Sequence, residues 1–398
     1  MFRFDINFKS PVFDFSDILN ISAIGESKMN IMGQPWKMGT LEIKNRLVRS
    51  ATVEGLSTED GAPTQRLIDI SVALARGGVG LIVAGAAYIS REGQGDMNTT
   101  GIDNNRLIEP LSRLCGAVHK AGGILAAQLL HCGSTVNSTI LPEKEALFGP
   151  SAMIDPLCGH RVVELNKDHI QRIVDDYAKA ALRAKEAGFR AVQIHAAHGY
   201  LINQFLSVSR NRRKDPYGGP LKHRALLLHQ VYEAIRGAVG KKFPIFIKMS
   251  AYDGFAGGVK PKEAARVAST LDAMGIDAIE VSAGTPEGAQ KGGWDHIIPA
   301  PFKEGSLLKY ALQIKQKVNC PVISVEGWRD PLEIANVLEK IDAVSMSRPF
   351  IREPNLVNRW LRGDLSPARC ISCNKCLELV MESGLGCIFH NRNKDGNA

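Results

Sequence analysis

Short apolar runs alternate with longer segments of helical periodicity from about residue 46 to residue 347. The runs are nearly continuous in apolar residues, as is typical of parallel strands that are buried on both faces. We predict strands over residues 46–52, 79–84, 123–129, 190–195, 244–250, 277–282, 321–325 and 342–346.

The segments between these strands have the pattern of amphipathic helices. Residues 167–187 carry apolar side chains three or four positions apart, and Gly188 is expected to end that helix. Eight units of strand and helix predict a closed (β/α)8 barrel, which is a TIM barrel of the α/β class. The alternative is an open, doubly wound sheet, but no GxGxxG motif follows the first strand.

The flanking segments divide the chain into three parts. We expect an N-terminal arm at residues 1–37, the barrel at 38–355 and a C-terminal extension at 356–398. The arm is expected to cover the barrel floor or to pack irregularly, and residues 132–165 to form an excursion above the third strand. No apolar run is long enough to cross a bilayer and the N-terminus does not resemble a secretory signal, so we expect a cytoplasmic protein.

Composition and charge narrow the choice of partners. The 44% hydrophobic and 23% charged residues are typical of a globular protein. Lys plus Arg is 49 and Asp plus Glu is 41, a net charge of +8, but the basic residues are spread along the chain. This pattern favours anionic small ligands over nucleic acid, and it leaves a homo-oligomer open.

Polar residues at the strand ends are the candidates for chemistry, because barrel enzymes place their active sites there. The fourth strand leads to His195, His198 and Tyr200, where two imidazoles can bind one substrate oxygen and a phenol can deliver a proton. Gln128 and Lys248, at the ends of the third and fifth strands, suit a polar heterocycle that gains negative charge. Alternatively, backbone groups satisfy the histidines, or the two bind a metal.

The turns after the seventh and eighth strands predict a phosphate site. Backbone amides at these turns, together with Arg348, lie where this fold most often holds phosphate. Alternatively, Arg348 forms a surface ion pair.

With these residues in place, the chain resembles the Old Yellow Enzyme family of FMN-dependent oxidoreductases. The resemblance covers about residues 38–355, and its fourth-strand segment is specific. The segments that carry it are KNRLVRSAT, GGVGLIVAGA, AAQLLHCG, IHAAHGYLINQFLSVSRNRRKDPYGGPLKHR, VISVEGW and AVSMSRPFI.

This resemblance implies FMN as cofactor and NADH or NADPH as electron donor. His195 and His198 then bind the oxygen of an unsaturated substrate, hydride passes through flavin N5 to an activated C=C bond, and Tyr200 donates the proton. Val53 stands where many relatives have a Thr or Cys that adjusts the flavin potential. The expected FMN-binding residues are Ser50, Ala51, Thr52, Ala86, Gln128, Lys248, Glu326, Gly327, Ser347 and Arg348.

Four of the eight cysteines lie close together near the C-terminus. Cys370, Cys373, Cys376 and Cys387 resemble the [4Fe-4S] ligand set of the longer branch of the family, which includes enoate and dienoyl-CoA reductases. The branch usually leaves three residues between its second and third cysteines, whereas two stand here. Zinc at the same cysteines, or free thiols, are the alternatives.

The longer relatives carry a dinucleotide-binding domain after their cysteines. No nucleotide fingerprint follows Cys387, so we expect that domain to be absent. Electrons then come from NAD(P)H directly or through a separate electron-transfer protein. An amine dehydrogenase of the same branch and an FMN/iron–sulfur electron-transfer subunit are the alternative functions, although the two histidines favour the enoate reductase or NADH oxidase type.

Overall fold

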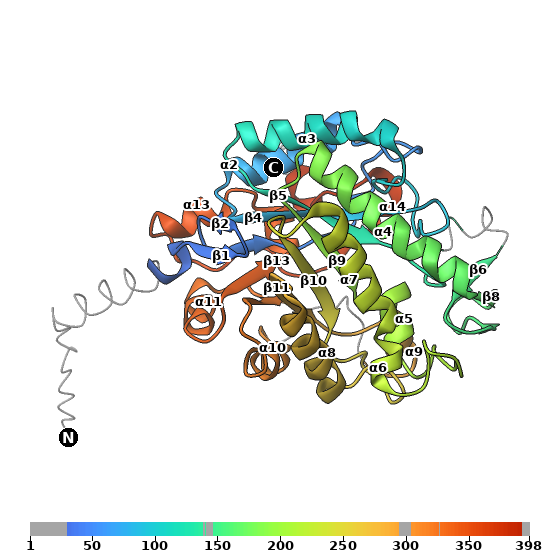
Figure 1. Ribbon diagram of the computed structural model, residues 1–398. Helices are drawn as coiled ribbons and strands as arrows, with labels where there is room; N and C mark the ends of the chain where they lie inside the picture. The colour runs from blue at the N-terminus through green and yellow to red at the C-terminus, as the bar shows by residue number, and fades with distance from the viewer. Residues whose placement is uncertain (1–29, 138–139, 141–145, 294–303, 326, 392–398) are drawn as a thin grey trace, which may run out of the picture.

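The computed structural model describes residues 30–137, 140, 146–293, 304–325 and 327–391, which form a closed barrel of parallel strands surrounded by helices (Figure 1). The barrel closes in the order β10-β11-β12-β13-β3-β4-β5-β9, which confirms the predicted TIM barrel. Its strands are β3 Leu47–Arg49, β4 Leu81–Tyr88, β5 Leu125–Leu130, β9 Ala191–Ala196, β10 Ile245–Ser250, β11 Ala278–Ser282, β12 Val322–Val325 and β13 Ala343–Met346.

Two strands differ from their predicted bounds in a way that affects the site. Strand β3 ends at Arg49, so the residues from Ser50 onward leave the strand and enter the barrel mouth. Strand β4 continues to Tyr88 beyond a register shift between Val83 and Ala86. The predicted end of the second strand at residue 84 is therefore too early, because a bulge allows the weakly β-forming Ala-Gly-Ala-Ala segment to extend the ladder, and Ala86 lies within the strand.

Helices outside the barrel cover its strands. Helix α4, Lys167–Ala187, has the predicted bounds: Asn166 accepts a hydrogen bond from the His169 N–H at its start, and Gly188 ends it in the left-handed conformation. The helices that cover the barrel are α2 Gln65–Arg76, α3 Ile108–Lys120, α4, α7 Leu226–Val239, α8 Pro261–Met274, α10 Leu308–Lys315, α11 Pro331–Leu338 and α13 Leu356–Leu361. Shorter helices are η1 Asn105–Leu107, α5 Leu201–Leu206, α6 Leu221–Arg224, α9 Pro286–Gln290 and α12 Arg348–Arg352.

A hairpin closes the N-terminal end of the barrel. Strands β1, Trp36–Met38, and β2, Leu41–Ile43, pair antiparallel, and their buried side chains share a core cluster with inward-facing residues such as Phe246. The hairpin crosses the boundary that the sequence places after residue 37, while residues 1–29 of the expected arm lie outside the described residues. The barrel floor is therefore filled by apolar packing, and its polar end is the opposite one.

Two additions accompany the barrel. The expected excursion contains a small sheet of β6 Leu147–Gly149, β7 Met153–Ile154 and β8 Arg161–Glu164. The C-terminal extension begins with α13, which packs on the barrel core, and after residue 363 it contains α14 Lys375–Ser383 and α15 Ile388–Asn391. Within the described part of the chain, no helix has both the length and the apolar character that a membrane span requires.

Candidate functional site

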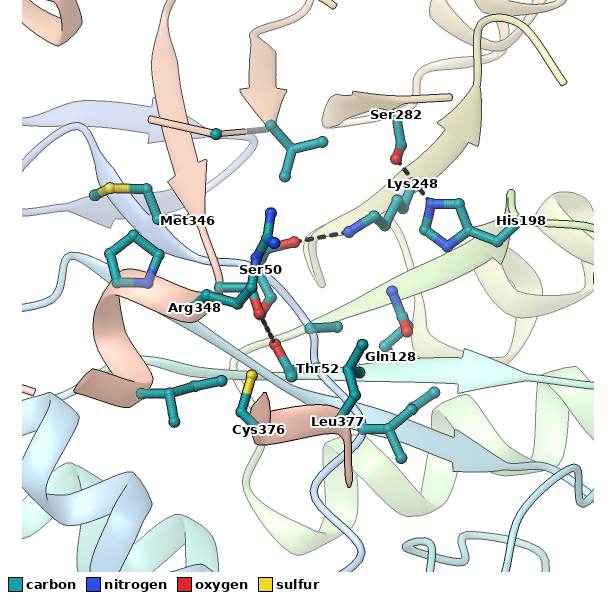
Figure 2. Close-up of a pocket in the computed structure, with 18 of the residues that line it drawn as sticks. Ser50, Thr52, Gln128, His198, Lys248, Ser282, Met346, Arg348, Cys376 and Leu377 are labelled. Atoms are coloured by element: carbon teal, nitrogen blue, oxygen red, sulfur yellow. Dashed lines mark hydrogen bonds between the residues drawn. The ribbon is translucent and has the colours of Figure 1, made fainter. Parts of the chain in front are cut away.

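A single cavity at the C-terminal ends of the barrel strands brings the predicted residues together (Figure 2). Glu326 lies outside the described residues. The predicted residues that line the cavity are Ser50, Ala51, Thr52, Ala86, Gln128, His195, His198, Tyr200, Lys248, Gly327, Ser347 and Arg348.

The aromatic side of the cavity is formed by three rings that follow β9. The His195 ring centroid lies 5.2 Å from that of His198 and 4.9 Å from that of Tyr200, both in edge-to-face geometry. His198 has a left-handed backbone with φ of +63°, and its Nε2 lies 2.7 Å from the Ser282 hydroxyl. The Ala197 N–H donates to His195 Nδ1 at 3.3 Å, so in a neutral His195 the proton sits on Nε2.

Lys248, on β10 next to β9 and in register with His195, places a cation in the neighbouring wall of the cavity. The residue is 4% exposed, and its ammonium donates to the Ser50 hydroxyl at 2.7 Å (Figure 2). Glu280 lies behind it, with a carboxylate oxygen 3.5 Å from Lys248 Nζ. The buried cation therefore has a buried counter-ion, as such a group requires.

Glu280 is a residue of the site that sequence reasoning missed. It is fully buried in β11 and accepts hydrogen bonds of 2.7 Å from Ser50, Ser345 and Gln193. Burial by itself raises the pKa of this carboxyl, but the Lys248 charge and these donors outweigh burial and leave the pKa below its ordinary value. The available signal was a single acidic residue inside the otherwise apolar run DAIEVS.

Gln128 continues this network to the next wall. It pairs with Gln193 across β5 and β9, and its amide nitrogen donates to the Gln193 oxygen at 2.7 Å. The two amides and the carboxylate thus form one connected chain of hydrogen bonds beneath the cavity.

Arg348 marks the end of the cavity where phosphate binding was predicted. It lies beside Ser347, whose hydroxyl is 2.7 Å from that of Thr52, and Gly327 lies on the neighbouring turn. The Arg348 guanidinium also donates to the Asn374 side chain, within the cysteine-rich segment. A cation and hydroxyls at one edge of a cavity suit a bound phosphate.

The four C-terminal cysteines line a second, smaller cavity, and Arg348 borders both cavities. Burial raises the pKa of the Cys370 and Cys376 thiols, and the charge of Arg348 opposes that shift. In the described part of the chain, no three His, Cys, Asp or Glu side chains are grouped closely enough to hold a metal ion. The thiols therefore surround a shared space without converging on one point.

The C-terminal extension also forms part of the main cavity wall, which the sequence did not indicate. Cys376 and Leu377 reach the cavity near Thr52 (Figure 2), and Val380 and Leu385 lie beside them. The two cavities therefore share a wall at the start of α14.

Known proteins match both the sequence and this fold. Residues 32–364 match the NADH:flavin oxidoreductase / NADH oxidase family. A metal reductase from Desulforamulus reducens is 35% identical over 360 residues, which cover 88% of this chain and 52% of that protein. A 4,4'-dithiodibutanoate disulfide reductase from Rhodococcus erythropolis is 30% identical over 386 residues, covering 90% and 94% of the two chains.

A solved 2-naphthoyl-CoA reductase complex has a TM-score of 0.85 and 25% identity, over 92% of this chain and 57% of that chain. The chain thus spans about half the length of relatives such as the metal reductase, and nearly the full length of the disulfide reductase.

Proposed function

Because the chain belongs to the NADH:flavin oxidoreductase / NADH oxidase family, we propose that it is a flavin-dependent NAD(P)H oxidoreductase that uses FMN to reduce activated C=C bonds. The electron donor is NADH or NADPH, and the substrate is of the enone or enoate type. The observation that carries this proposal is one cavity that combines a buried cation and amide with two imidazoles and a phenol.

The donor set of the cavity fits FMN. Lys248 and Gln128 suit the polar edge of the ring, while Arg348 and Ser347 suit the phosphate. When bound, FMN supplies the hydride chemistry, taking a hydride from the nicotinamide and passing it to the substrate. The chain positions both partners and balances the charge.

His195 and His198 bind the substrate oxygen in this proposal. Neutral His195 carries its proton on Nε2, and the contact with Ser282 orients the His198 ring. When His198 Nε2 accepts from the Ser282 hydroxyl, each imidazole keeps one N–H donor. Two such donors suit an acceptor such as a carbonyl oxygen better than a protonated amine, which favours the enone type over an amine substrate. Polarising that oxygen makes the conjugated carbon more electrophilic.

Tyr200 completes the reaction as the proton donor. One alkene carbon takes the hydride and the other takes the phenolic proton, so the C=C π bond is replaced by two C–H bonds. The Tyr200 ring packs against His195, which holds the phenol beside the oxygen-binding pair.

For the cysteines we propose a [4Fe-4S] cluster. A single zinc ion draws four thiolates to about 2.3 Å from one point, whereas a four-iron cluster is ligated at separate corners. The four cysteines line one shared cavity, and their spacing resembles a [4Fe-4S] ligand set, which supports the cluster. Cys376 borders both cavities, so a cluster held there would lie next to the FMN site, and a separate electron-transfer protein is a candidate partner.

The Tyr200→Phe substitution tests the catalytic assignment. Alkene reduction, followed anaerobically by stopped flow, should slow by about 10²-fold or more, whereas flavin reduction by NAD(P)H should stay within about twofold. Tyr232→Phe is the matched control, since its hydroxyl bonds the Met274 carbonyl away from the cavity. Equal losses in both half-reactions would contradict the proton-donor role, and purified protein that binds no FMN would refute the proposed function.

A further inference from the structure

Glu280 connects the two polar groups that face the proposed ring site. We infer that it is a positioning residue, which holds the Lys248 ammonium in place and turns the carbonyl oxygen of the Gln128 amide toward the ligand. The inference rests on the proposed FMN function. It explains how the cavity distinguishes hydrogen-bond donors from acceptors along the polar edge of the flavin ring.

The first arm of the network runs through Ser50 to Lys248. A carboxylate can only accept hydrogen bonds, so the Ser50 hydroxyl gives its proton to Glu280. The Ser50 oxygen is then left to accept from Lys248 at 2.7 Å. With the longer contact to Glu280 at 3.5 Å, two of the three ammonium N–H groups face this network and one remains for the ligand.

The second arm runs through Gln193 to Gln128. Because Glu280 only accepts, the Gln193 amide must direct its nitrogen toward the carboxylate, at 2.7 Å. Its oxygen therefore faces Gln128 and accepts from that amide nitrogen. The Gln128 carbonyl oxygen is then left for the cavity, beside one remaining N–H.

The resulting order of donors and acceptors matches the pyrimidine edge of a flavin. That edge presents two carbonyl oxygens on either side of the N3–H group. Lys248 offers a donor to a ring oxygen, and the Gln128 oxygen offers an acceptor to N3–H. Without the fixed charge of Glu280 both glutamines can reverse, and the Gln128 acceptor is no longer imposed.

The test compares the dissociation constants of FMN and 3-methyl-FMN, measured by flavin fluorescence with the full-length apoprotein. The methyl group removes the N3–H donor, so the wild-type protein should bind FMN about tenfold or more tightly than the analogue. Glu280→Gln is nearly isosteric but can donate, so it should reduce that ratio to about twofold. A purely structural defect would instead weaken both flavins alike and leave the ratio intact.

Two further variants distinguish a specific effect on the ratio of dissociation constants from a general folding defect. Gln193→Met interrupts only the second arm and should lower the ratio as Glu280→Gln does. Glu287→Gln changes a buried carboxylate that pairs with Arg210 outside the cavity, and it should keep the wild-type ratio. A wild-type ratio near one, or an unchanged ratio in Gln193→Met or Glu280→Gln, would overturn the role of Glu280 and leave FMN binding intact. Failure of the wild-type protein to bind FMN would instead refute the proposed function.

Discussion

The barrel mouth and the C-terminal extension border the same cavity but are built differently. At the barrel mouth, Gln128 is 2% and Lys248 4% exposed, and hydrogen bonds from neighbouring strands hold both. In the part of the extension after residue 363, α14 has no buried residue, Cys373 is exposed, and Ile371 is 57% exposed. The first region is fixed by the fold, whereas the second has little core of its own.

A few contacts connect the extension to the barrel. Leu385 packs in a small cluster with Leu56 and Leu67, and Arg66 donates to the carbonyls of Ser383 and Leu385. A segment with so small a core generally gains much of its stability from a bound group. The barrel fold therefore preorganises the site proposed for the flavin ring, whereas the stability of the cysteine-rich segment is expected to depend on the group that it binds.

The largest expected effect comes from removing a cysteine. Cys376→Ser should lower the iron content from about four per chain to less than about one, because a cluster held by three thiolates is readily lost. We also expect proteolysis within the extension to accelerate about tenfold or more, since local opening there loses its constraint. Metal analysis and limited proteolysis under anaerobic conditions measure the two effects.

Cys158→Ser is the control for this substitution, because Cys158 is only partly buried and lies outside the extension. It should leave iron content and cleavage unchanged. Zinc without iron in the wild-type protein would replace the cluster assignment, and an extension equally resistant in Cys376→Ser would contradict the comparison.

A smaller effect is expected where the two regions meet, at Arg348. Arg348→Ala should weaken FMN binding about 10- to 100-fold, because a charge-assisted contact to phosphate contributes about 1.5–3 kcal/mol. Arg352→Ala is the matched control, since Arg352 borders the cysteine cavity but not the main cavity. In fluorescence titrations, the FMN dissociation constant of Arg352→Ala should stay within about twofold of the wild-type value. An equal loss of FMN affinity in both variants would show that net charge alone is responsible.

Much of the barrel and its mouth was predictable for a geometric reason. Continuous apolar runs mark buried parallel strands, and the C-terminal ends of such strands must meet at one end of a barrel. Residues as distant in sequence as Ser50 and Arg348 therefore share one cavity, as expected.

The remaining parts depended on contacts that have no local signature. Glu280 looks like one charge in an apolar run until β10 and β11 place it beside Lys248. Leu377 and Val380 line the cavity only because the chain returns over the barrel mouth after residue 363, which no periodicity in the sequence indicates. The end of the second strand was misplaced because a bulge depends on pairing between strands as much as on local composition.

The smallest predicted effect tests the junction between the two regions, at Glu54. Its carboxylate accepts from the Gly85 N–H in β4 at 3.1 Å, and its backbone carbonyl accepts from the Leu385 N–H at 2.7 Å. Burial raises the pKa of Glu54 to about 7, against the opposing effects of Arg49 and the Gly85 N–H. The folded protein therefore retains a proton at Glu54 over a pH range in which the unfolded chain has lost it.

Stability should consequently fall as pH rises between the ordinary pKa of 4.5 and about 7, and this contribution should level off above that range. Allowing for partial exposure of Glu54, we expect it to lower the free energy of unfolding by about 1–2 kcal/mol across the window. Glu54→Gln should remove that part of the decline, whereas Glu186→Gln, an exposed change on α4, should leave it unchanged. Urea unfolding at pH 5, 6, 7 and 8 measures the difference, and parallel curves for wild type and Glu54→Gln would show that Glu54 already ionises normally at this junction.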